Sequence, residues 1–73
     1  MTQQQLQSIC DQKLQLAINN NDEIEIKKYQ TIQQILTKTD AIKKLGVEMS
    51  INILQDLGFA KTEAQKIYLS FIK

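Results

Sequence analysis

Apolar residues recur at spacings of three and four along almost the whole chain, which is the pattern of amphipathic α-helices. No proline interrupts this pattern anywhere in the 73 residues. The longest uninterrupted apolar run, Leu16-Ala17-Ile18, has three residues, too few for a membrane span or a secretory signal. The pattern therefore predicts an all-α domain.

Four helices are expected, because three stretches of helix-breaking residues divide the chain. The stretches are Asn19–Asn21, Thr37–Asp40 and Leu57–Phe59. Asparagine tolerates the left-handed backbone on leaving a helix, and Gly58 is a natural residue just past a helix end. The first break is short, so the two helices beside it should form an antiparallel hairpin.

Helix starts are marked by a capping side chain followed three residues later by an amide or a carboxylate. The stretches with this pattern are Thr2–Gln5, Asp22–Glu25 and Thr62–Gln65. The carboxylates of Asp22–Glu25 also suit the positive end of a helix dipole, so a helix start is favoured there over a weak cation site. The predicted core faces are Leu6, Ile9, Cys10, Leu14 and Ala17; Ile24, Ile32, Ile35 and Leu36, bordered by Tyr29; and Ala64, Ile67, Tyr68, Phe71 and Ile72.

Residues 40–57 carry two apolar stripes and leave two alternatives open. The stripes are Ile42, Leu45 and Met49, and Val47, Ile51, Leu54 and Leu57. One helix could span the segment with Gly46 inside it, or Gly46 could end a short helix before a second begins near Glu48. Glycine within a helix costs about 1 kcal/mol relative to alanine, which favours the break.

Residues 1–73 are expected to form one helical domain, with a hairpin over 1–40 and a helix-turn-helix corner over 41–73. The net charge is +1, so charge does not demand a nucleic acid or a membrane surface as partner. A chain this short sits near the size at which core burial only just offsets chain entropy, and self-association is one remedy.

The composition closes most routes to catalysis. There is no histidine or arginine and only one cysteine, Cys10, so imidazole bases, Cys-His pairs and zinc sites are unavailable. We therefore expect no enzyme activity, no metal or cofactor, and no small-molecule substrate. Cys10 lies on an apolar stripe, where a core role is favoured over a reactive thiol. A single cysteine also fits a cytoplasmic protein.

The stretch Ile51–Phe59, followed by Ala60–Ala64, carries a local resemblance. Residues 49–73 resemble the first two helices of a ubiquitin-associated (UBA-like) domain, in which an amphipathic helix ends in Met-Gly-Phe and the next helix carries an alanine. Leu57-Gly58-Phe59 stands for that loop and Ala64 for the small residue that lets the helices approach. The family has a third helix, which takes part in ubiquitin recognition and which this sequence does not supply, so ubiquitin binding is not carried over.

The same segment also resembles the first helix pair of the HU class of bacterial DNA-bending proteins. That class also requires a three-stranded sheet and basic arms, which are not found in this sequence. Because two unrelated families share the pattern, a general helix-turn-helix corner is the favoured interpretation.

Three functional hypotheses follow. The first is a non-enzymatic protein–protein interaction module that self-associates as a homodimer, with Leu57, Gly58, Phe59, Tyr68 and Phe71 as candidate partner-binding residues, although a core role is favoured for each. The alternative is a nucleic-acid-binding regulator whose phosphate contacts would come from Lys43, Lys44, Lys61, Lys66 and Lys73. The low net charge and the lack of arginine disfavour it. A third possibility is a helical accessory protein, such as an antitoxin, that caps a larger partner.

Overall fold

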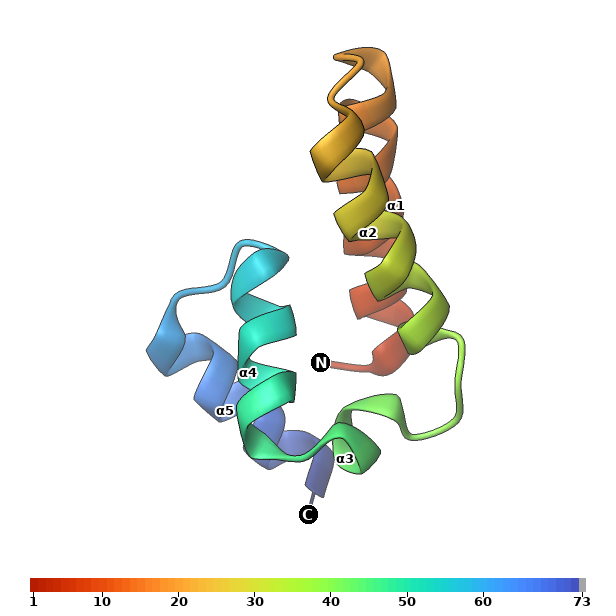
Figure 1. Ribbon diagram of the computed structural model, residues 1–73. Coiled ribbons are helices and arrows are strands. Elements are labelled where there is room, and N and C mark those ends of the chain that lie inside the picture. The colour runs from red at the N-terminus through yellow and green to blue at the C-terminus, as the bar shows by residue number, and fades with distance from the viewer. Residues whose placement is uncertain (73) are drawn as a thin grey trace.

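The computed structural model describes residues 1–72, which form five helices and no strand (Figure 1). The helices are α1 (Gln3–Asn19), α2 (Glu23–Leu36), α3 (Ala41–Leu45), α4 (Val47–Asp56) and α5 (Lys61–Ile72). The all-α class, the N-terminal hairpin and the helix-turn-helix corner are confirmed. None of the helices within residues 1–72 combines the length and apolar character that crossing a bilayer requires.

The first two helices form the expected hairpin, and their starts are capped as predicted. Thr2 and Gln5 form a complete capping box on α1, and the Asp22 side chain accepts a hydrogen bond from the Glu25 amide at the start of α2. Asn21 takes the left-handed conformation, with φ of 54°, so the chain reverses within a few residues.

The predicted third helix is divided at Gly46, which is the alternative that the sequence favoured. Gly46 has φ 86° and ψ 172°, a conformation essentially restricted to glycine, and it separates α3 from α4. The two helices stay joined because the buried Ser50 hydroxyl donates a hydrogen bond of 2.6 Å to the Ile42 carbonyl. This bond satisfies a hydroxyl with no access to water.

Gly58 also behaves as predicted and terminates α4 with φ of 108°. The backbone amide of Phe59 then donates to the Leu54 carbonyl, which completes the helix end. The start of α5 differs from the prediction, because the helix begins at Lys61 and Thr62 lies inside it. Its first amides are supported instead by Glu63, whose carboxylate accepts from the Ala60 amide at 3.4 Å.

One buried apolar cluster draws side chains from all five helices. Its members are Leu6, Cys10, Ala17, Tyr29, Ile32, Leu36, Ile42, Ile53, Leu54, Leu57 and Ala64. The predicted face of α1 is correct, since all five of its residues are buried or half-buried.

Two residues that were predicted to face the core, Ile24 and Ile72, are exposed. Ile24 is 83% exposed. It lies eight positions before Ile32, which at 100° per residue places the two side chains about 80° apart around the helix axis. Tyr29 occupies the buried face of α2 instead. Val47 and Met49, one from each of the two apolar stripes of residues 40–57, are also exposed, because the core face of α4 is Ser50, Ile53 and Leu54.

The hairpin extends beyond the other three helices (Figure 1). The α4–α5 corner comes close to α1 near Lys13, since a Cβ on Gly58 would lie 3.6 Å from the Lys13 Nζ. Near the tip of the hairpin, Leu16, Ile18 and Ile24 are all exposed. Within residues 1–72, no other helix covers the tip of the hairpin (Figure 1).

Two glutamines of α1 hold the connection between α2 and α3. The Gln3 side-chain amide donates to the carbonyls of Leu36 (2.7 Å) and Lys38 (2.6 Å), while its oxygen accepts from the Ala41 amide at 3.1 Å. Gln7 adds a second hydrogen bond to Leu36, at 2.8 Å. These bonds satisfy backbone groups that the end of α2 leaves without helical partners.

Replacing Gln3 with alanine removes three hydrogen bonds and is expected to lower the free energy of unfolding by about 1–3 kcal/mol. The matched control is Gln4→Ala, since Gln4 is exposed and has no such bonds; its expected change is within about 0.5 kcal/mol. Urea denaturation followed by circular dichroism measures both. Equal stability of the two variants would contradict the role given to Gln3.

Gly46→Ala is expected to destabilise the fold by about 1–3 kcal/mol, because an alanine is strained at φ 86°. A Cβ at this position would meet nothing within 4 Å, so the cost comes from backbone conformation and not from a clash. The same urea titration tests it, with Asn52→Ala on the exposed side of α4 as control. A variant as stable as the parent would show that α3 and α4 can join as one helix.

Candidate functional site

The five residues predicted to bind a partner do not form one surface. Leu57 is only 2% exposed and belongs to the core cluster, and Gly58 is a turn residue. Phe59 is half-buried and packs against the same cluster. These three residues build the corner between α4 and α5 and leave little side chain for a ligand.

Tyr68 and Phe71 lie on α5, and both are half-buried against the core. Tyr68 also lines a groove with Leu69 and with residues of α4, whereas Phe71 does not. Of the predicted residues, Tyr68 therefore contributes to a surface depression, and it lies toward the opposite end of the helix pair from the corner.

This groove lies between the first half of α4 and the second half of α5 and has a volume of about 250 Å³. Its lining is Val47, Ile51, Gln65, Tyr68 and Leu69, which we call the α4–α5 face. Val47 and Leu69 are each 54% exposed, and none of the five carries a charge. The face is thus an uncharged and largely apolar depression in contact with water.

The α4–α5 face arises because both helices are apolar on more than one side. Ala64 is fully buried at the contact between α4 and α5, where a small residue permits close approach. Val47 and Ile51 are one helical turn apart, and Leu69 follows Gln65 at the same spacing, so each pair lies along one side of its helix. Leu69 was not predicted as a site residue. The feature that could have identified it is that Leu69 is apolar but lies outside the predicted core stripe of its helix.

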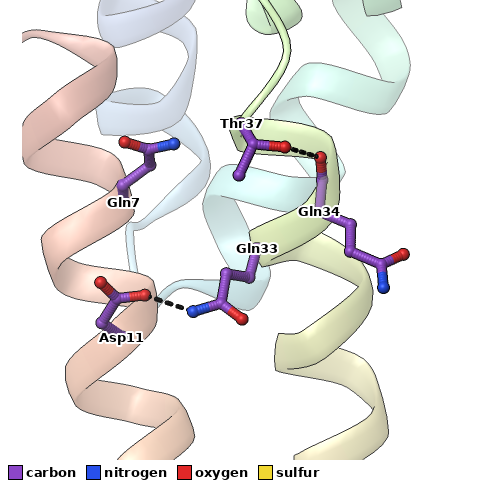
Figure 2. A pocket seen from close by; sticks show the side chains of 5 residues that line it. All are labelled: Gln7, Asp11, Gln33, Gln34 and Thr37. Carbon is purple, nitrogen blue, oxygen red and sulfur yellow. Dashed lines mark hydrogen bonds between the residues drawn. The ribbon is translucent and has the colours of Figure 1, made fainter.

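A second groove, of about 290 Å³, lies between α1 and α2 and is lined by the polar residues Gln7, Asp11, Gln33, Gln34 and Thr37 (Figure 2). Within it the Gln33 side-chain amide donates to the Asp11 carboxylate at 2.7 Å, and the Thr37 hydroxyl donates to the Gln34 carbonyl at 2.6 Å. The side chains of Gln7, Asp11, Gln33 and Thr37 all bond to another side chain or to the backbone, so the groove is part of the contact between the two helices.

The lysines proposed for phosphate contacts do not form a single basic stripe. Lys61 and Lys66 are both exposed on α5, but five positions rotate them about 140° apart around the helix axis. Lys43 and Lys44 are exposed on α3, and Lys73 lies outside the described residues. Lys44 and Lys38 border a third groove, of about 210 Å³, with an apolar floor.

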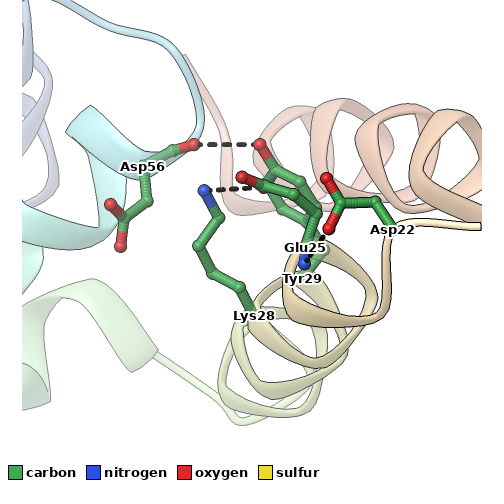
Figure 3. Close-up of polar contacts among 5 residues, drawn as sticks. All are labelled: Asp22, Glu25, Lys28, Tyr29 and Asp56. Atoms are coloured by element: carbon green, nitrogen blue, oxygen red, sulfur yellow. Dashed lines mark hydrogen bonds and ion pairs between the residues drawn. The ribbon is translucent and has the colours of Figure 1, made fainter. Parts of the chain in front are cut away.

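The acidic stretch at the start of α2 is engaged in local contacts (Figure 3). Asp22 caps the helix, and Glu25 pairs with Lys28 at 2.8 Å. The hydrogen bond that the Lys28 ammonium donates to the Glu25 carboxylate raises the pKa of Lys28. Within residues 1–72 no cluster of metal-ligating side chains occurs.

Tyr29, next to Lys28, connects the hairpin to the second half of the chain. Its hydroxyl donates to the Asp56 carbonyl at 3.4 Å, near the end of α4 (Figure 3). The Lys28 ammonium lies 4.7 Å from the centre of the Tyr29 ring, within the range of a cation–π contact. Tyr29 therefore supports the packing of the helices.

Cys10 is fully buried, and its Sγ donates a hydrogen bond to the Tyr29 carbonyl at 3.3 Å. Burial, with a smaller contribution from the charge of Asp11, raises the pKa of Cys10 to about 11. A thiol that is buried and protonated at neutral pH is a poor nucleophile.

Comparison of the chain with protein-family models, with curated proteins and with solved structures returned no match. The resemblance of residues 49–73 to UBA-like domains therefore stays a prediction.

Because the pKa of Cys10 is raised in the folded protein, the free energy of unfolding is expected to fall at alkaline pH. The unfolded thiol ionises above about pH 9 while the folded thiol stays protonated. The contribution of Cys10 to the free energy of unfolding is therefore complete below pH 9 and is lost as the pH rises towards 11. We expect the stability difference between the parent and Cys10→Ala to change by about 2 kcal/mol over this interval. Urea titrations of both chains at several pH values measure it. If the free energies of unfolding of the two chains changed with pH in parallel, the interpretation of Cys10 as a buried, protonated thiol would be wrong.

Proposed function

We propose that this protein is a small, non-enzymatic, helical protein-interaction module whose binding surface is the α4–α5 face. The observation that carries the proposal is the uncharged groove of about 250 Å³ between two packed helices, bordered by the half-exposed side chains of Val47 and Leu69. Exposed apolar residues that occur singly need no explanation, but a continuous apolar depression is typical of a protein contact.

The shape of the groove supports a protein partner over a small molecule. Sites for small ligands are concave, have volumes of about 300–1,000 Å³ and combine an apolar lining with several convergent polar groups. The α4–α5 face is smaller and offers two polar side chains, Gln65 and Tyr68. A groove along two helices instead suits the apolar side chains of a partner helix.

The absence of charge in the groove supports a protein partner over a nucleic acid. Binding to nucleic acid depends on lysine or arginine contacts with phosphates, which release counterions. None of the groove residues is a lysine, and the two lysines described on α5 lie on different sides of that helix. If α5 were inserted into a groove of DNA, the side chains of Tyr68 and Leu69 would lie on the inserted helix.

A photoreactive phenylalanine analogue placed at Leu69 tests the proposal in extracts of native cells. Leu69 is 54% exposed, so the substitution should leave the fold intact. The same analogue at Gln30, which is exposed on α2, is the matched control. We expect light-dependent cross-linking to protein from position 69 and little from position 30.

Circular dichroism first establishes that both labelled chains are folded. Equal cross-linking from the two positions, or none from position 69, would refute the α4–α5 face as a protein-binding surface. Steep, salt-dependent retention of duplex DNA by the unlabelled chain would favour the nucleic-acid alternative instead.

A further inference from the structure

We infer that the groove between the end of α2 and α3 is a second binding site, which takes a protein segment carrying an aliphatic side chain flanked by carboxylates. The groove is lined by Ile35 of α2, Lys38 of the connection, and Ala41, Lys44 and Leu45 of α3, and we call it the α2–α3 groove. It shares no lining residue with the α4–α5 face, so this inference is independent of the proposed function.

The floor of the α2–α3 groove is apolar and recessed. Ile35 and Leu45 are half-buried and Ala41 is buried, whereas the two lysines on the border are exposed. The volume, about 210 Å³, is below the range of about 300–1,000 Å³ that is typical of sites for small molecules. A floor of this size and depth suits an aliphatic side chain that projects from a partner protein.

Two lysines distinguish this groove from the α4–α5 face, whose lining is uncharged. Within residues 1–72, neither the Lys38 nor the Lys44 ammonium forms an ion pair with a carboxylate. Residues 30–45 contain three lysines and one acidic residue, Asp40, which does not line the groove. The border of the groove therefore carries positive charge that its surroundings do not balance, and its charge complements a partner that brings carboxylates.

Hydrogen bonds hold the backbone that carries the two lysines. The Lys38 amide donates to the Ile35 carbonyl at 3.1 Å, and the Lys38 carbonyl accepts from the Gln3 side chain at 2.6 Å. The Lys44 amide donates to the Asp40 carbonyl at 3.0 Å. Asp40 has φ of 53° and lies where the chain turns into α3 (Figure 1). A border with a fixed backbone loses less conformational freedom when a partner binds.

An acidic protein segment fits these features better than a nucleic acid or a membrane does. Phosphates would contact the lysines but would leave the apolar floor unfilled, and affinity for nucleic acid depends on many phosphate contacts. Anionic membranes attract clusters of about four to eight basic residues, whereas this groove has Lys38 and Lys44 on its border. An aliphatic side chain can fill the floor while carboxylates on the same segment reach both lysines.

NMR titration of the isotope-labelled chain with synthetic helical peptides tests the inference. Each peptide is rich in alanine and about 20 residues long, so that it forms a helix. The first carries a leucine with a glutamate one turn before it and another one turn after it, all on one side of the helix. The second has glutamines in place of the glutamates, and the third has alanine in place of the leucine.

The first peptide should shift the backbone amide signals of Ile35, Ala41 and Leu45. We expect a dissociation constant on the order of 1 mM, since only a few side chains take part. The second and third peptides should each bind at least about threefold more weakly, because one lacks the charges and the other lacks the aliphatic side chain.

The matched variants are Lys44→Gln and Lys43→Gln. Both lysines are exposed on α3, but Lys44 lines the groove and Lys43 does not. The change in net charge is the same in both variants. Lys44→Gln should raise the dissociation constant of the first peptide about two- to fivefold, and Lys43→Gln should leave it nearly unchanged.

A charge swap tests the role of the two lysines directly. The double variant Lys38→Glu, Lys44→Glu should prefer a fourth peptide, which has lysines in place of the glutamates, over the first peptide. The parent chain should show the opposite preference. Circular dichroism checks that all variants are folded.

The inference is overturned if the first peptide leaves the signals of the α2–α3 groove unchanged or binds no more tightly than the second peptide. Equal weakening by Lys43→Gln and Lys44→Gln would also overturn it. Shifts confined to Val47, Ile51 and Leu69 would move the binding site to the α4–α5 face, which contradicts this inference and supports the proposed function. Shifts of the groove signals by duplex DNA or by soluble phosphatidylserine, but not by the first peptide, would assign the groove to another class of partner.

Discussion

The buried cluster shared by all five helices is the constraint on which the rest of the structure depends. Isolated helices shorter than about 12–15 residues are marginal in water, so α4, with ten residues, depends on packing against its neighbours. Leu6 and Leu36 of the hairpin and Leu54 of α4 are fully buried in one cluster, so each pair stabilises the other. Where the cluster ends, towards the tip of the hairpin, Leu16 and Ile24 are exposed.

Local rules of sequence predicted most of the helical organisation, because they act over three or four residues. The Thr2 and Asp22 caps, the reversal at Asn21 and the termination at Gly58 all depend on side chains or backbone angles within one turn of helix. The division at Gly46 belongs to the same class, although two alternatives remained open there. Its backbone angles decide the matter, since they are accessible to glycine and lie outside any helix.

Contacts between distant segments were not predictable in this way. Gln3 bonds to the backbone of Leu36, more than thirty positions away, yet in the sequence it is one of three consecutive glutamines. The sequence cannot say which of the three faces the end of α2. Ser50 is similar, because a serine between apolar residues signals an exposed position until the Ile42 carbonyl is placed beside it.

The candidate site was predicted only in part, for the same reason. Leu57 and Phe59 were predicted as site residues because they flank a glycine in a recognisable turn. A corner between two helices, however, needs apolar side chains to fill it, and both residues pack there. Residues used to stabilise a corner are not free to bind. Tyr68 was identified, and its neighbours Val47 and Leu69 were not, because only the packing of α4 on α5 brings them together.

The limited size of the core explains why one side of the α4–α5 pair is left apolar and exposed. Ala64 of α5 is fully buried, and Ile53 and Leu54 of α4 pack in the same cluster as the buried residues of the hairpin. None of the other helices in the described part of the chain covers the flank where Val47 and Leu69 lie, and this flank is largely apolar and uncharged. A longer chain could cover it with another helix. The flank that folding leaves uncovered is therefore the surface to which we assign partner binding.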